Sequence, residues 1–226
     1  MQLRSIARPS SRRLARVVGA LGFTLTCAAC GSLFGPARPP EGQPGHIAGF
    51  LGAVVSDEPR ATLIGRQVLS QGGDAADAAV AVGFALAVTL PSRAGLGGSG
   101  ACLAFAPGRD SINQGQPEAI LFTPEAPPQI SSGADRPAAL PMLPRGLYLL
   151  HARYGTGDMG PLIAPAETLA RFGTAASRAF VQDLDLVSGP LFADPQARAV
   201  FSVNGAALAV GQTFRQPDLA VTLSQL

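Results

Sequence analysis

The amino-acid sequence predicts a mixed α/β (α+β) fold, in which apolar helices pack against short strands. Between residues 49 and 122 the hydrophobic patterns follow the order strand, helix, helix, strand, strand. The segment at 74–90 is apolar on nearly all sides, which is typical of a helix buried against a sheet. A chain of 226 residues, 47% of them hydrophobic, has enough material for one such domain and flanking segments.

The first 29 residues differ from the remainder and predict an export signal. Five arginines precede the apolar run VVGALGFTLTCAAC, and a basic region before a short apolar one is the pattern of secretory signals. The end of this run, CAAC, resembles a bacterial lipobox, in which the sulfur of Cys30 would carry a diacylglyceryl group. An ordinary signal peptide cleaved nearby is the alternative. We therefore expect an exported lipoprotein of the bacterial periplasm, anchored to the membrane through lipidated Cys30.

Residues 30–47 predict a flexible linker between this anchor and the folded part, because they are rich in Gly and Pro and lack periodicity. The folded part is then expected over 48–226. Without the first 29 residues, the chain carries 12 arginines against 15 acidic residues, a formal charge of −3. This acidic balance argues against a nucleic-acid partner.

The first elements of the folded part follow from hydrophobic runs and helix-capping residues. An apolar run predicts a buried strand at 49–56, and an apolar face predicts a helix at 59–70. Asp74 is expected to cap the helix at 74–90 by accepting hydrogen bonds from free backbone N–H groups. Asp77 adds a negative charge near the positive end of the same helix.

The sequence GLGGSG at 95–100 matches the G-x-G-x-x-G pattern of dinucleotide-binding loops but has the wrong context. Such a loop follows a strand and opens a helix, whose N-terminus holds the pyrophosphate. Here the glycines follow a helix and lead into a strand, so the negative end of a helix faces them. We therefore expect no nucleotide, and we expect Gly97, Gly98 and Gly100 to allow a tight turn or close packing.

Two apolar runs at 99–105 and 119–122 flank a loop rich in Gly, Pro, Asn and Asp, which predicts a hairpin. Cys102 lies in the first run and is the remaining free thiol if Cys30 is acylated. It could act as a nucleophile if His151 lay beside it. We favour the other interpretation, a small apolar residue packed in a strand. We assign no metal-binding residue and no cofactor.

The C-terminal half predicts helices and one small hairpin. Helical patterns cover 143–155 and 161–173, each ended by a glycine. Asn204-Gly205 predicts the turn of a hairpin within SVNGAALAVGQTF. A last helix begins at Gln216, and its apolar face continues to the final residue, so this face is either cut off from its continuation or docked on another surface.

Four stretches, in the same order, resemble the gamma-glutamyltranspeptidase (glutathione hydrolase) family. They are GGDAADAAVAVG with the strand and helix before it, LPRGLYLLHARYG, PLIAPAETLARFG and VNGAALAVGQTFRQPDLAVTL. The resemblance extends over 48–226 and covers the N-terminal part of the family's large subunit. It implies an N-terminal nucleophile hydrolase fold with αββα layers, here incomplete.

In that family one precursor cuts itself ahead of a Thr, which becomes the first residue of a small subunit. The resemblance implies that the hydroxyl of this Thr attacks the gamma-glutamyl carbonyl, while its own amine assists the proton transfer. The acyl group then passes to water or to an acceptor amine, which amounts to gamma-glutamyl transfer from, or hydrolysis of, glutathione-like substrates.

The sequence departs from the family pattern in two places. It ends within the large-subunit part and contains no T-T-H-like stretch, so we assign no catalytic residue and expect a separately encoded small subunit as a possible partner. The family also carries an Arg in an F-R-E-x-A-P stretch, where it binds the substrate α-carboxylate. Here the stretch is FTPEAPP, and Thr123 stands where that Arg is expected. Thr has no charge to pair with a carboxylate, and Glu125 would repel one.

Three interpretations of function remain open at this stage. The first is a member of this family whose catalytic half is missing from the chain, either as a truncated gene product or as the large half of a two-gene enzyme. The second is a divergent, non-catalytic lipoprotein with a binding or scaffold role. The third is a signal-bearing domain of unrelated fold and no enzymatic activity.

The lipobox predicts that Cys30→Ser releases the protein from the membrane fraction, because the sulfur that would carry the lipid is lost. Immunoblots of membrane and soluble fractions measure this. Cys102→Ser serves as the control and is expected to leave the protein in the membrane fraction. Unchanged fractionation of Cys30→Ser would remove the lipid anchor from the interpretation.

Overall fold

A computed structural model describes residues 52–106, 115–128 and 139–226. The expected export signal at 1–29, Cys30 and the linker at 30–47 lie outside the described residues, so their predictions stay untested. Within the described part no helix is long and apolar enough to cross a membrane.

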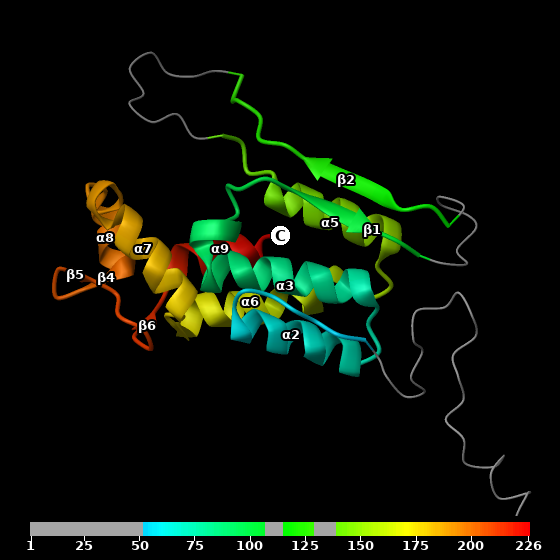
Figure 1. The fold of residues 1–226 in the computed structure, drawn as a ribbon, viewed down its shortest axis with the longest axis horizontal. Coiled ribbons are helices and arrows are strands. Elements are labelled where there is room, and N and C mark those ends of the chain that lie inside the picture. The colour runs from blue at the N-terminus through cyan, green and yellow to red at the C-terminus, as the bar shows by residue number, and fades with distance from the viewer. Residues whose placement is uncertain (1–51, 107–114, 129–138) are drawn as a thin grey trace, which may run out of the picture. The chain divides into compact units, whose positions relative to one another are not determined.

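The described residues form helices and short strands in the following order along the chain (Figure 1). The helices are α2 (Pro59–Ser70), α3 (Ala75–Thr89), α4 (Pro91–Ala94), α5 (Leu143–Tyr154), α6 (Met159–Phe172), α7 (Arg178–Leu191), α8 (Pro195–Phe201) and α9 (Pro217–Ser224). The strands are β1 (Gly100–Ala104), β2 (Glu118–Phe122), β3 (Thr174–Ala175), β4 (Ser202–Val203), β5 (Ala206–Ala207) and β6 (Thr213–Phe214). This mixture of helices and strands confirms the predicted fold class.

Helix α3 is the centre of the main hydrophobic core, and α2, α5 and α6 all pack against it (Figure 1). Apolar residues occur on every side of α3, so its buried side chains face each of these neighbouring helices. They include Val80, Phe84 and Val88. Asp74 caps the helix as predicted, because its carboxylate accepts hydrogen bonds from the N–H groups of Ala76 and Asp77.

Glycines let the elements of this core approach one another closely. A Cβ added at Gly65 of α2 would lie 2.6 Å from Val82 of α3, and one at Gly146 of α5 would lie 2.3 Å from the ring of Phe122 in β2. Both distances are far below van der Waals contact, so these positions need glycine for packing rather than for backbone conformation.

β1 and β2 form the predicted hairpin as an antiparallel pair, in register from Gly100 opposite Phe122 to Ala104 opposite Glu118. The inner face of β2 is buried through Ile120 and Phe122, which pack against α5. The outer face is apolar and open, since Leu103 is 77% exposed and Leu121 is 67% exposed. Among the described residues this sheet has two strands, as do the other two sheets.

The C-terminal segment forms a second, smaller hydrophobic cluster. The rings of Phe180, Phe201 and Phe214 lie together, with centroids 5.2–5.9 Å apart. The predicted hairpin is present as β4 and β5, and its Asn204-Gly205 turn has positive φ at both residues, as two-residue hairpin turns require. Helix α9 docks on α6 with Leu223 buried, so the second of the two alternatives for this apolar face is confirmed.

One exposed arginine joins three segments that lie far apart in the sequence. Arg93 of α4 pairs with Asp57 before α2 at 2.9 Å and with Asp183 of α7 at 2.7 Å. Ser92 also donates a hydrogen bond to Asp183. The hydrogen bonds from Arg93 and Ser92 lower the pKa of Asp183 to about 2.

The predicted strand at 49–56 is wrong for the residues that the structure describes, since 52–56 have no strand structure. A strand needs a hydrogen-bonding neighbour, and within the described part none lies beside this segment. Part of the apolar pattern instead reflects packing against a helix, because Val54 contacts Gly65 of α2. Val55, by contrast, is 92% exposed.

The contact of Gly146 with Phe122 predicts that Gly146→Ala destabilises the fold by about 1–3 kcal/mol, because the added methyl group overpacks a buried ring. Urea denaturation followed by circular dichroism measures the change. Gly160→Ala in α6 is the matched control, because nothing lies within 4 Å of the added Cβ. Equal denaturation midpoints for the two variants would contradict the packing role of Gly146.

Candidate functional site

The glycine cluster at 95–100 and Thr123 lie at the same end of the β1–β2 hairpin. Gly100 pairs with Phe122, so Thr123 follows directly at this end. The carbonyl of Gly98 accepts hydrogen bonds from the N–H groups of Met142 and Leu143, at 3.2 and 3.0 Å, which fixes the start of α5 beside the glycine loop.

The sequence predicts that Gly97, Gly98 and Gly100 allow a tight turn or close packing, and the structure shows such a close approach at Gly98 and Gly100. A Cβ at Gly98 would lie 2.9 Å from the carbonyl oxygen of Gly95, and one at Gly100 would lie 2.9 Å from the Phe122 ring. Nothing lies within 4 Å of a Cβ at Gly97. The loop leads into β1 and not into a helix, so it lacks the helix N-terminus on which a dinucleotide loop depends.

Thr123 is exposed where β2 ends, and its side chain brings no charge to this place. The next acidic residue, Glu125, is also exposed, and its carbonyl oxygen accepts a hydrogen bond from the N–H of Leu140 at 2.9 Å. The segment after β2 is thus tied to the chain that enters α5. The place where the resemblance expects an Arg has a neutral side chain followed by an acidic one.

Cys102 and His151, the pair considered for nucleophilic chemistry, form no hydrogen bond with each other in the described part of the chain. Cys102 is half-buried in β1, and burial raises the pKa of its thiol, which disfavours the reactive thiolate. The ring of His151 lies instead with its Nε2 2.8 Å from the carbonyl oxygen of Gly157. This geometry supports packing roles for both residues.

Asp77 has a larger role than its position in the first turn of α3 indicated. Its carboxylate is fully buried and accepts hydrogen bonds from the N–H groups of Asp74, Thr156 and Gly157 and from the Thr156 hydroxyl, at 3.0–3.1 Å. It therefore joins the start of α3 to the loop between α5 and α6. The sequence pattern gave no sign of this contact, because Thr156 lies 79 residues away.

Burial by itself would raise the pKa of Asp77 above its ordinary value of 3.8. The hydrogen bonds from Asp74, Thr156 and Gly157 act in the opposite direction and stabilise the charged form, so the pKa is lowered. The carboxylate is therefore ionised at neutral pH and serves as a structural acceptor.

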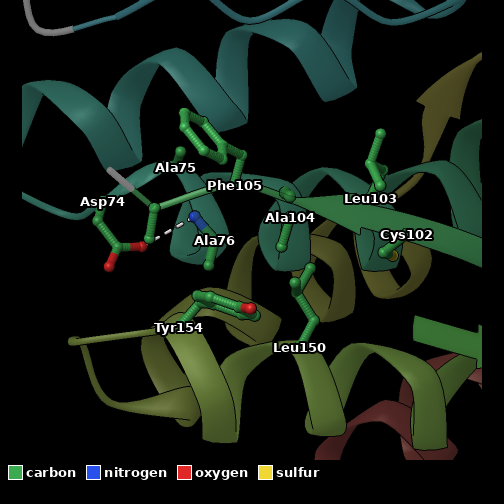
Figure 2. A pocket seen from close by; sticks show the side chains of 11 residues that line it. Asp74, Ala75, Ala76, Cys102, Leu103, Ala104, Phe105, Leu150 and Tyr154 are labelled. Carbon is green, nitrogen blue, oxygen red and sulfur yellow. Dashed lines mark hydrogen bonds between the residues drawn. The ribbon is translucent and has the colours of Figure 1, made fainter. Parts of the chain in front are cut away.

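A cavity of about 580 Å³ lies between the start of α3, β1 and α5 (Figure 2). Its walls are mostly apolar, and the charged group among them is Asp74. Tyr154 also lines it and donates a hydrogen bond from its hydroxyl to Glu118 at 2.6 Å. The cavity holds no His, and across the described ranges no group of three or more His, Cys, Asp or Glu side chains could hold a metal ion.

Comparison with known proteins identifies the class to which this fold belongs. The structure is similar to that of Helicobacter pylori gamma-glutamyltranspeptidase, with a TM-score of 0.68 and 29% identity over 80% of this chain and 55% of that one. It is also similar to the Bacillus anthracis transpeptidase CapD, with a TM-score of 0.66 and 28% identity over 77% and 57% of the two chains. Over the aligned residues the fold is therefore that of the N-terminal nucleophile hydrolases.

Sequence comparison gives the family. The model of the gamma-glutamyltranspeptidases matches residues 61–226, and the chain belongs to this family. It is 32% identical to the Escherichia coli glutathione hydrolase proenzyme over 77% of this chain, and 31% identical to Arabidopsis thaliana glutathione hydrolase 2 over 80%. The chain spans 32% of the length of each of these two relatives.

The buried carboxylate predicts that Asp77→Asn lowers the free energy of unfolding by about 2–4 kcal/mol at pH 7, because a charged acceptor of several hydrogen bonds is lost. The pKa of Asp77 is lower in the folded chain, so its stabilisation is complete above pH 3.8 and is lost as the pH falls through the lowered value. The urea midpoints of the two proteins should therefore approach each other as the pH falls below 3.8.

The matched control is Asp158→Asn, at the start of α6, where the carboxylate caps no backbone N–H group. We expect less than about 0.5 kcal/mol of change there, as for most surface substitutions. A difference between Asp77→Asn and the parent protein that stays constant to pH 3 would contradict the role of the ionised carboxylate.

Proposed function

We propose that this chain is the large-subunit half of a gamma-glutamyl transferase or glutathione hydrolase, and that a separately encoded small subunit supplies the nucleophilic Thr. Family membership across 61–226 supports this proposal, as do the relatives that are named glutathione hydrolases. The exposed apolar face of the β1–β2 hairpin is the structural observation that carries it. A face with Leu103 and Leu121 open to water is stabilised when a second layer covers it.

In the proposed reaction, the hydroxyl oxygen of the partner's Thr forms a bond to the gamma-glutamyl carbonyl carbon, and the bond from that carbon to the leaving amine breaks. The proton of the hydroxyl passes through the Thr amine to the leaving nitrogen. Water or an acceptor amine then attacks the ester and regenerates the hydroxyl. The chain described here contributes the scaffold on which the partner folds, and the end of β2 that the acyl donor would approach.

Thr123 sets the expected substrate preference. A gamma-glutamyl group has a free α-carboxylate, and Thr123 offers it no positive charge. Loss of a charge-assisted hydrogen bond costs about 1.5–3 kcal/mol, which weakens binding about 10–100-fold. We propose that the natural acyl donor binds with correspondingly less dependence on that carboxylate.

A divergent, non-catalytic lipoprotein with a binding or scaffold role is the second candidate. The observation that favours it is the neutral Thr123 followed by Glu125 at the hairpin end. The DNA directly downstream distinguishes the two candidates, because an open reading frame for a Thr-initiated small subunit is expected only for the enzyme. Export and lipid anchoring through Cys30 are proposed in both cases.

The isolated chain is expected to show no turnover of a chromogenic gamma-glutamyl anilide, because in this proposal the nucleophilic Thr belongs to the separate small subunit. Addition of the small subunit should produce turnover, and Thr123→Arg in that complex should lower KM about 10–100-fold. Thr123→Ser is the control and should leave KM unchanged. Turnover by the purified chain alone would contradict the need for a partner, and an unchanged KM for Thr123→Arg would contradict the role of position 123.

A further inference from the structure

We draw no further inference here: the strongest candidate, the cavity of about 600 Å³ between the starts of α2 and α7 and the loop after β5, carries nothing because Glu58 is a helix cap, Arg60 and Arg178 are exposed at helix N-termini, and nothing in the described part of the chain shows what occupies it.

Discussion

The burial of α3 is the constraint on which the remaining structure depends. An isolated helix of this composition exposes apolar surface on every side, so it is stable only when neighbours cover it. α2, α5 and α6 provide that cover, and α5 in turn supports the β1–β2 hairpin. The orientation of α3 is fixed at its N-terminal end, where the buried carboxylate of Asp77 holds the loop after α5. A single charged residue thereby ties α3 to the end of α5, the helix on which the hairpin packs.

Local features of the fold could be predicted from the sequence because neighbouring residues determine them. Asp74 reveals the start of α3, and Asn204-Gly205 reveals the β4–β5 turn. The helix α8 was missed, although Asp194 and Pro195 provide the expected cap and first-turn proline. The strand expected at 49–56 was wrong because its formation depends on a neighbouring strand, which a local pattern cannot supply.

The candidate site was less predictable, since it depends on contacts across long stretches of sequence. The hairpin end with Thr123 could be located from a motif, because the family pattern fixes a residue type at a known offset. The partners of Asp77 and the cavity beside β1 could not, because each unites residues from α3 with others near α5. The glycines include positions whose role could be predicted from the sequence and one whose role could not. Gly98 and Gly100 were understood from their context, whereas the need for glycine at Gly146 follows from a ring 24 residues earlier.

Arg93 has a consequence for how the two hydrophobic clusters hold together. Its guanidinium is shared between Asp57 and Asp183, and roughly half of the side chain is open to solvent. Contacts of this kind weaken as dissolved ions screen them, whereas buried apolar contacts do not. Rising ionic strength therefore weakens the contacts of Arg93 with Asp57 and Asp183, while the apolar packing of Phe180 and Leu184 of α7 against Leu90 is left in place.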